Sequence, residues 1–190
     1  MIKGKIVGLR SLELEDLVLL RDWRNTVSFR RNFREHRELN MANQNAWFNR
    51  TMASSNDYMF VIQRLADNVP VGAAGLLYIN WIIRSADFSF YIGLKELYID
   101  NDGLALESAR LLIDYGFKNL NLNKIWMELY EFDEAKMEFF TKKFGFSVDG
   151  RLRENCFEEG KYYDSYIISL LKEEYLKGKS IVGQSENGKV

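Results

Sequence analysis

The chain contains Tyr91-Ile92-Gly93 followed by Asn101-Asp102-Gly103-Leu104-Ala105, a glycine-containing turn that leads from an apolar strand into a long helix. Small residues at 103 and 105 allow backbone N–H groups to approach an anion closely, and the helix N-terminus adds about half a positive charge. On its own, the same pattern is more often an ordinary turn. The stretch therefore predicts either a pyrophosphate-binding helix N-terminus or a plain strand-to-helix connection.

Before and after this turn, apolar residues that alternate with polar ones predict strands, and apolar residues at helical spacing predict helices. Together these patterns indicate an α+β fold. Strands are expected at 6–10, 58–64, 69–78, 86–92, 125–131, 146–157 and 161–171, and helices between Glu13 and Asn25 and at 40–53, 103–120 and 133–144. Residues 28–37 are rich in arginine and aromatic side chains but show no clear periodicity. We expect them to form a loop.

Length and composition indicate one globular domain. Of the 190 residues 47% are hydrophobic, and 26 basic side chains stand against 27 acidic ones, for a net charge of −1. We place the domain at residues 1–176 and expect 177–190, polar and glycine-containing, to be a flexible tail. The near-zero charge argues against nucleic-acid binding, and no apolar run approaches the ~20 residues of a membrane span.

The cysteine and histidine content limits which disulfides and metal sites the chain can form. Cys156 is the only cysteine and His36 the only histidine, so an internal disulfide is excluded and a zinc site of the usual kind is disfavoured. We therefore expect no metal. The start of the chain is charged and amphipathic rather than an apolar signal core, which favours a cytoplasmic, bacterial-type location.

Several short stretches carry a resemblance to a known family. They are Trp23-Arg24-Asn25, residues 80–87, Gly103-Leu104-Ala105-Leu106-Glu107, Lys142-Lys143-Phe144-Gly145-Phe146, residues 149–154 and Gly160-Lys161-Tyr162-Tyr163-Asp164. Together they resemble the GCN5-related N-acetyltransferases, the GNAT superfamily, from about residue 3 to residue 175. The C-terminal stretches look like its ribosomal-protein-type and amino-sugar branches.

The resemblance implies a fold and a co-substrate. The implied fold is α/β/α layered, with a mixed, mostly antiparallel sheet of six to seven strands and about four helices, splayed between the fourth and fifth strands. The implied co-substrate is acetyl-CoA, with its pantetheine along Phe90, Tyr91 and Ile92. Its pyrophosphate is expected on the amides of Asn101, Asp102, Gly103, Leu104, Ala105 and Leu106.

The sequence departs from the family in this loop. The family usually opens it with Arg or Gln and a Gly, whereas Asp100-Asn101-Asp102 bring two carboxylates beside the expected diphosphate. An exposed pair of unit charges at close range costs only about 1 kcal/mol in water, so binding is expected to be weakened rather than lost. Further along, Asp133 stands near the family's pantetheine-binding Asn. Lys136 and Lys143 are candidates for CoA phosphates, or for a solvated helix face.

Direct acetyl transfer from a thioester to an amine needs a base for the amine and a proton for the departing thiolate. Asp87 and Glu128 are the base candidates. Glu128 alternates with Trp126 and Tyr130 on one strand face, which is either a lined pocket or the solvent side. Many relatives carry a proton-donating tyrosine where this chain has Thr141, whose hydroxyl is a poorer acid. The candidate proton sources are therefore Thr141, Tyr130, Tyr162, Tyr163 and water.

The acceptor is expected against the first two helices and the loop between them. Arginines at 21, 24, 30, 31 and 34 are interleaved with Trp23, Phe29 and Phe33, a mixture that suits an anionic acceptor as well as a charged surface loop. The candidate acceptor-binding residues are Trp23, Arg24, Asn25, Arg30, Arg34 and His36.

We therefore predict an acetyl-CoA-dependent N-acetyltransferase for a primary amine of a small acceptor, with a nucleotide-linked amino sugar favoured. The alternatives are a protein N-terminal (ribosomal-protein-type) acetyltransferase and a CoA-binding module that no longer turns over. Many relatives pair or exchange C-terminal strands, so a homodimer through residues 162–171 is an assembly that the resemblance allows.

Overall fold

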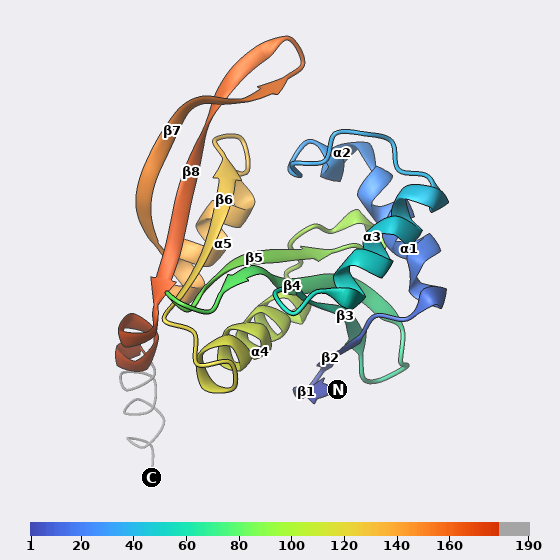
Figure 1. Cartoon of the computed structure of the whole chain (residues 1–190), viewed down its shortest axis with the longest axis horizontal. Helices are drawn as coiled ribbons and strands as arrows, with labels where there is room; N and C mark the ends of the chain where they lie inside the picture. Colours follow the sequence, from blue (N-terminus) through green and yellow to red (C-terminus); the bar gives the residue numbers. More distant parts are fainter. Residues whose placement is uncertain (179–190) are drawn as a thin grey trace.

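A computed structural model describes residues 1–178 and places eight strands in one sheet with the order β1-β2-β3-β4-β5-β6-β8-β7 (Figure 1). All neighbours are antiparallel except β5 and β6, which are parallel. The strands are β1 Ile2–Lys3, β2 Val7–Ser11, β3 Tyr58–Arg64, β4 Pro70–Asn80, β5 Ser85–Ile92, β6 Lys124–Tyr130, β7 Ser147–Glu158 and β8 Lys161–Leu171.

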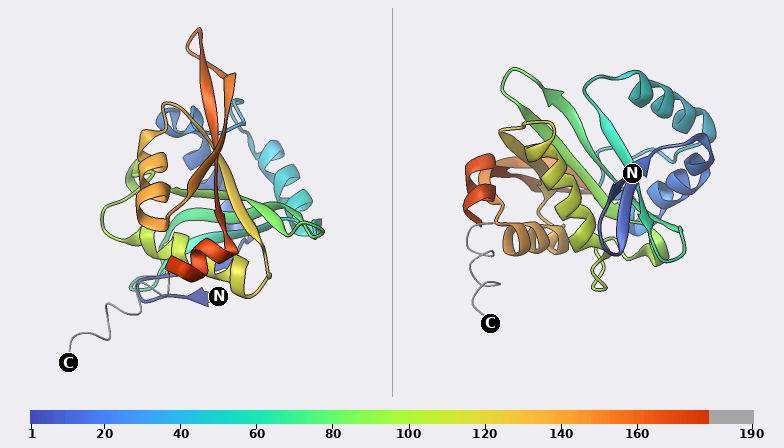
Figure 2. Two further views of the ribbon diagram at one scale, coloured as in Figure 1. Left: turned by 90° about the vertical axis from the view of Figure 1, so that its left-hand side faces the viewer. Right: turned by 90° about the horizontal axis from the view of Figure 1, so that it is seen from below.

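Helices cover both faces of this sheet (Figure 2). They are α1 Leu17–Asn25, α2 Val27–Arg30, α3 Met41–Ala53, α4 Leu104–Lys118 and α5 Glu134–Phe144, with short 3-10 turns η1 Leu14–Asp16 and η2 Leu94–Glu96 and a helix over 172–178. One core lies under α4 and α5 and includes Leu112, Ile125 and Phe140. The other lies under α1 and α2 and includes Trp23 and Tyr91. This layered, mostly antiparallel arrangement agrees with the predicted fold class.

The predicted splay is confirmed, and it lies between β5 and β6, the fourth and fifth strands when the two-residue β1 is not counted. Only Ser85, Ala86 and Asp87 of β5 pair with β6, the last pair being Asp87 with Trp126. Beyond that pair β5 remains bonded to β4, its other side bonds to Tyr98 at Ile92, and β6 pairs along its whole length with β8. The divergence leaves a wedge-shaped gap that begins at Asp87.

Alternation along β5 and β6 determines which side chains reach each face. Ile125, Met127 and Leu129 belong to the core under α4 and α5, so Trp126, Glu128 and Tyr130 lie on the opposite face, as the alternation predicted. On β5, Phe88 and Phe90 belong to that same core, and Tyr91 belongs to the core under α1. Asp87 and Glu128 therefore share the face that carries α1 and α3.

The structure differs from the sequence-based expectations at three places. The sheet has eight strands because Ile2–Lys3 pairs with β2, and two residues are too few to produce a detectable alternation. The expected loop 28–37 begins with the last residues of the short helix α2, which buries Phe29. The helix over 172–178 takes in the first two residues of the predicted tail 177–190, and 179–190 lie outside the described residues.

Two further features bear on the surface. The β7–β8 hairpin extends well beyond the rest of the sheet (Figure 1) and exposes apolar side chains, namely Val148, Leu152, Phe157 and Tyr162. Within residues 1–178, none of the helices combines the length and the apolar character that crossing a bilayer requires.

Candidate functional site

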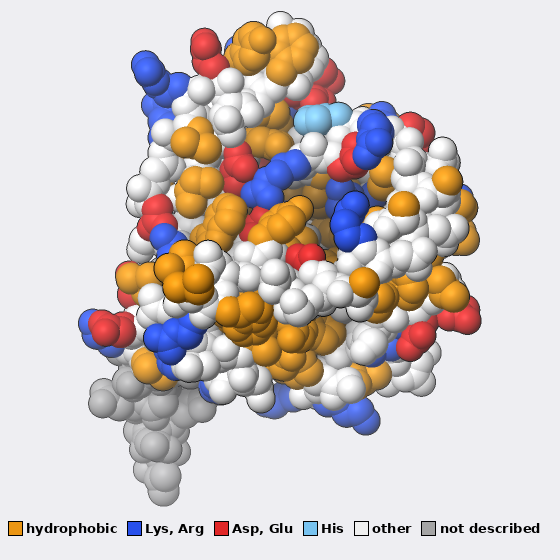
Figure 3. Space-filling model, in the orientation of Figure 1, with side chains coloured by type: hydrophobic (Ala, Val, Ile, Leu, Met, Phe, Trp, Pro, Cys, Tyr) orange, Lys and Arg blue, Asp and Glu red, His pale blue; other side chains and the backbone are white. Residues whose placement is uncertain are grey.

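A cavity of about 610 Å³ opens on the sheet face that carries α1 and α3. Its walls come from α1, the segment after α2, α3, the strands β3 to β6 and one residue of α5. Figure 3 shows basic and acidic side chains gathered around a hollow on this face of the molecule. The cavity is thus polar at its mouth, although β4 and β5 form its apolar floor.

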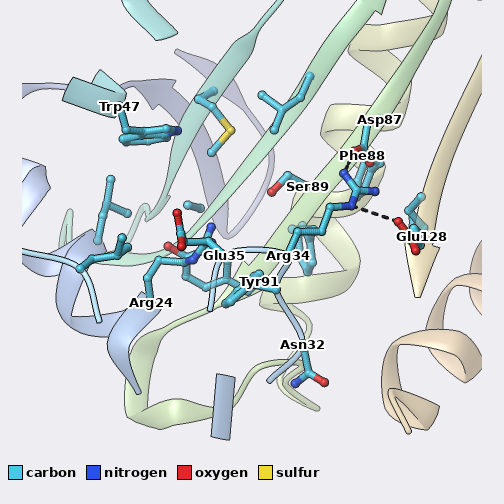
Figure 4. A pocket seen from close by; sticks show the side chains of 18 of the residues that line it. Arg24, Asn32, Arg34, Glu35, Trp47, Asp87, Phe88, Ser89, Tyr91 and Glu128 are labelled. Carbon is cyan, nitrogen blue, oxygen red and sulfur yellow. Dashed lines mark hydrogen bonds and ion pairs between the residues drawn. The ribbon is translucent and has the colours of Figure 1, made fainter. Parts of the chain in front are cut away.

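The centre of the cavity is an ion triad in which Arg34 bridges two carboxylates. Its Nη1 lies 2.6 Å from Oδ2 of Asp87, and its Nε lies 3.1 Å from Oε2 of Glu128. Figure 4 shows Arg34 reaching between these two residues from the segment that follows α2. Both carboxylates are largely buried, whereas about half of the Arg34 side chain is exposed. The two base candidates are therefore adjacent and open to the cavity.

Each carboxylate of the triad has its own environment. Burial raises the pKa of Asp87, and Arg34 opposes this rise through its charge and its hydrogen bond. Glu128 is held in place from β7 and β8, since Asn155 Nδ2 and Ser165 Oγ each donate to its Oε1 at 2.7 Å. Among residues 1–178, Glu128 is thus held by three side-chain donors and Asp87 by one.

Neither Thr141 nor Tyr130 is presented to the cavity. The Thr141 hydroxyl donates to the backbone carbonyl of Met137 at 2.7 Å, a bond to the preceding turn of its own helix. Tyr130 is buried without lining the cavity, and burial raises the pKa of its phenol to about 12. Such a phenol is a weaker acid than an ordinary tyrosine.

The splay provides a strand edge that suits the pantetheine predicted for it. The backbone N–H and C=O of Ile92 bond to Tyr98, at 2.9 Å and 2.8 Å, on the side away from β4. Because the direction of the bonds alternates, Phe90 and Phe88 present their amides to the same edge, beyond the last β6 pair. That edge can accept an amide-bearing chain as an added strand. Ile92 is already paired there, and Tyr91 points into the α1 core, so Phe88 and Phe90 fit better.

The predicted pyrophosphate position is already filled by a side chain of the protein. Asp100 is buried, and its carboxylate accepts from the backbone N–H of Leu104 at 3.0 Å and from that of Ala105 at 2.5 Å. Gly103 adopts a left-handed φ of 92°, which turns the loop so that Asp100 folds back on the helix. Asp100 is therefore not the exposed acid that we expected. The amides of Leu104 and Ala105, which were predicted to bind the pyrophosphate, already donate to the Asp100 carboxylate.

The other predicted cofactor contacts are dispersed. Asn101 and Asp102 are exposed, and Leu106 lies on the first turn of α4. Asp133 caps α5, and its Oδ2 accepts from the Tyr98 hydroxyl at 2.6 Å. Lys143 is exposed in the last turn of α5 and does not reach the cavity.

Lys136 is neither a phosphate contact at the surface nor part of a solvated helix face. It is buried, lines the cavity, and holds its Nζ 4.5 Å from the centre of the Tyr98 ring. Burial lowers the pKa of Lys136, and the charge of Asp133 opposes that effect. The sequence could not show this because Lys136 lies in the polar first turn of α5.

Of the six predicted acceptor residues, only Arg24 and Arg34 line the cavity. Trp23 packs so tightly over Gly93 that a Cβ there would lie 2.1 Å from its ring, so Trp23 is a core residue. The side-chain amide of Asn25 donates to the backbone carbonyl of Leu39 and accepts from its N–H, and Arg30 is paired with Glu38. His36, pale blue in Figure 3, is exposed and outside the cavity.

Several cavity residues had no recognisable signal in the sequence. The structure adds Phe33, Glu35, Asn43, Gln44, Trp47 and Ser89 to the lining. Glu35 accepts from Arg37 at 2.6 Å and 2.9 Å, and those bonds lower its pKa to about 2. The available signal was the arginine- and aromatic-rich stretch 28–37, which contains Phe33 and Glu35.

The site has the chemical groups needed to take a proton from an amine. Within residues 1–178, no three side chains of His, Cys, Asp or Glu come together closely enough to hold a metal ion. A carboxylate pair beside a partly apolar cavity can attract an ammonium group and accept its proton. The splay edge then supplies a place for an amide-bearing carrier on the adjoining side.

Comparison with known proteins gives consistent matches. The family model described as Acetyltransferase (GNAT) domain matches residues 7–147. The spermidine N(1)-acetyltransferase of Escherichia coli (strain K12) is 28% identical over 179 residues, which cover 94% of this chain and 93% of that protein.

Solved structures of N-acetyltransferases superpose on this fold. The crystal structure of spermidine N-acetyltransferase from Vibrio cholerae in complex with CoA and spermine superposes with a TM-score of 0.82 at 26% identity, covering 91% of this chain and 99% of that one. A dodecameric structure of spermidine N-acetyltransferase from Vibrio cholerae gives a TM-score of 0.78 at 26% identity, covering 92% and 99%.

Proposed function

The chain belongs to the GNAT acetyltransferase family and is an N-acetyltransferase that takes its acetyl group from acetyl-CoA, and from that premise we propose that the acceptor amine binds beside Asp87 and Glu128. The observation that carries this placement is the Arg34 triad at the start of the splay. It brings two carboxylates to the start of the splay, which supports our placement of the acceptor beside the thioester.

Acetyl-CoA supplies an acetyl group activated as a thioester, and the residues of the chain must make the amine reactive. An alkylammonium with a pKa of about 10 is mostly protonated at neutral pH. The carboxylates attract it, and Asp87, whose pKa burial raises, accepts its proton directly or through water. The amine nitrogen then bonds to the acetyl carbon as the carbon–sulfur bond breaks. The nitrogen releases its extra proton to solvent, and the departing thiolate takes up a proton from solvent.

Two acceptor classes have specific support. Spermidine is named for the relatives, and polyamine acetylation is therefore one candidate. The cavity lining, however, contains five cationic side chains, Arg24, Arg34, Arg37, Arg50 and Lys136, against three acids, Glu35, Asp87 and Glu128. A polycation would meet net repulsion there, so an amine that also carries negative charge, such as a nucleotide-linked amino sugar, is the candidate that the cavity favours.

A thiol-release assay with acetyl-CoA tests the proposal. The panel contains spermidine, a uridine diphosphate amino sugar with a free amine, and short peptides with free N-termini. We expect release with at least one small amine and loss of release in Asp87→Asn. Binding of acetyl-CoA with no release from any acceptor would contradict the proposal.

We also propose that the chain forms a homo-oligomer through the β7–β8 hairpin. The support is the set of exposed apolar side chains on that hairpin and the dodecamer described for the Vibrio cholerae protein. Light scattering after chromatography measures the assembly, and Phe157→Ser is expected to reduce its mass. An unchanged monomeric mass in both proteins would refute this assembly.

A further inference from the structure

We propose that Arg24 and Lys136 together bind an anionic group, a carboxylate or a phosphate, on the same acceptor whose amine lies at Asp87 and Glu128. The inference rests on the proposed function and defines its acceptor class further. It starts from two cationic side chains that line one cavity from different helices, Arg24 from α1 and Lys136 from α5.

The guanidinium of Arg24 is half-buried and, within residues 1–178, makes neither a hydrogen bond nor an ion pair. Its central carbon lies 3.9 Å from the centre of the Phe33 ring, and its Nε is inaccessible to solvent and makes no hydrogen bond. Within residues 1–178 no carboxylate forms a salt bridge with it, and Glu35, the acid that attracts it most, gives its hydrogen bonds to Arg37. Figure 4 shows Arg24, Glu35 and Tyr91 close together at one side of the cavity.

The ammonium of Lys136 is in a similar situation. In the described part of the chain, its Nζ has neither a hydrogen bond nor a salt bridge and lies over the Tyr98 ring. The nearby acids are engaged elsewhere, because Asp133 accepts from Tyr98 and from the start of α5, and Asp87 pairs with Arg34. Both cations lie beside the Phe33 ring, since the central carbon of Arg24 is 3.9 Å and the Nζ of Lys136 is 6.0 Å from its centre, so their charges repel each other.

Lys136 is buried and Arg24 half-buried, and within residues 1–178 neither is paired with a carboxylate. Two such like charges form an unfavourable arrangement unless an anion joins them. The other cations of the cavity differ, since Arg34 and Arg37 each have a carboxylate partner and Arg50 is exposed. An anion between Arg24 and Lys136 would be fixed by charge-assisted hydrogen bonds. The protein would therefore select an amine with an attached carboxylate or phosphate over a polyamine.

Matched amine pairs test this directly. Beta-alanine is compared with propylamine, and 2-aminoethyl phosphate with ethanolamine, by acetyl-CoA-dependent thiol release. The variants are Arg24→Gln and Lys136→Gln. Their controls are Arg21→Gln, on the same helix but paired with Asp22, and Lys142→Gln, paired with Glu138 on α5.

In the wild type we expect a lower KM for the anionic member of at least one pair, and the pair that shows it identifies the carboxylate or the phosphate. Each site variant should raise that KM by about tenfold or more, as loss of a charge-assisted bond implies, without changing the KM of the neutral member. Both controls should match the wild type. Equal KM values within each pair, or equal effects of the variants on both members, would overturn the inference while leaving the acetyltransferase function in place.

A binding measurement separates this inference from the reaction. Trp47 lines the cavity, so its fluorescence reports titration with inorganic phosphate and, separately, with acetate, in the absence of acetyl-CoA. Saturable binding to the wild type that is lost in both site variants, with unchanged melting temperatures, supports the site even if no amine in the panel is acetylated. Identical titrations for all five proteins would refute it.

Discussion

The carboxylate of Asp100 accepts a hydrogen bond from the backbone N–H of Leu104 at 3.0 Å and from the next amide along α4. A buried side chain therefore occupies the donors that the resemblance assigns to the diphosphate of acetyl-CoA. Either the diphosphate displaces Asp100 or it binds elsewhere. The two cases differ in what happens when the charge of Asp100 is removed.

Asp100→Asn removes the negative charge but keeps one oxygen acceptor for the helix amides. If the diphosphate competes for these donors, the KM for acetyl-CoA should fall several-fold. The KM for S-acetylpantetheine, which has no diphosphate, should stay unchanged and serves as the matched control. An equal change for both donors, or a rise for acetyl-CoA, would show that Asp100 is not a competitor.

Asp87→Asn should lower kcat by about 10²- to 10⁴-fold, the usual contribution of a positioned general base. Acetyl-CoA binding, measured by calorimetry, should be unaffected because the splay edge begins beyond this residue. Glu131→Gln is the control, since Glu131 is exposed and outside the cavity. A kcat within twofold of the wild type would remove Asp87 from the mechanism.

Arg34→Met should shift the acid limb of the kcat/KM profile to higher pH. Burial raises the pKa of Asp87, and Arg34 holds it down, so loss of Arg34 leaves the carboxyl protonated up to a higher pH. The base form, and with it the activity, is then lost earlier as the pH falls. Arg30→Met, paired with Glu38 outside the cavity, should keep the wild-type profile. A shift toward lower pH would contradict the assignment.

Glu107→Gln should destabilise the protein at pH 7 and have less effect at pH 3. The Glu107 carboxylate accepts from the backbone N–H groups of Lys5, Ile6 and Val7 at 2.8 Å, 2.7 Å and 2.9 Å. Burial alone would raise the pKa of Glu107, but these three donors lower it below the ordinary value. The stabilisation is therefore complete above that ordinary value and is lost as the pH falls through the folded-state pKa.

Urea unfolding at the two pH values measures this difference, and hydrogen bonds to a charged group suggest about 1.5–3 kcal/mol at pH 7. Glu138→Gln, on the exposed face of α5, is the control for loss of a surface carboxylate. A destabilisation that is the same at both pH values would show that the charge of Glu107 does not hold the segment between β1 and β2 against α4.

The sequence by itself determined the order of the elements, the splay through the family resemblance, and the shared face of Trp126, Glu128 and Tyr130. These follow from local information, because strand alternation and helical spacing depend on neighbours a few residues apart. For the same reason the boundaries of β3 and α3 are close to those expected. The two-residue strand β1 was missed because so short a segment carries no period.

Only the tertiary structure decided which charged side chains meet. Arg34 and Asp87 are 53 residues apart in the chain, and Arg34 and Glu128 are 94 apart, so no spacing rule connects them. The return of Asp100 onto its own helix depends on the left-handed backbone at Gly103, and the burial of Lys136 depends on the aromatic rings around it. A sequence lists the charges of a protein, but which of them are neutralised depends on distances and burial that exist only once the chain has folded.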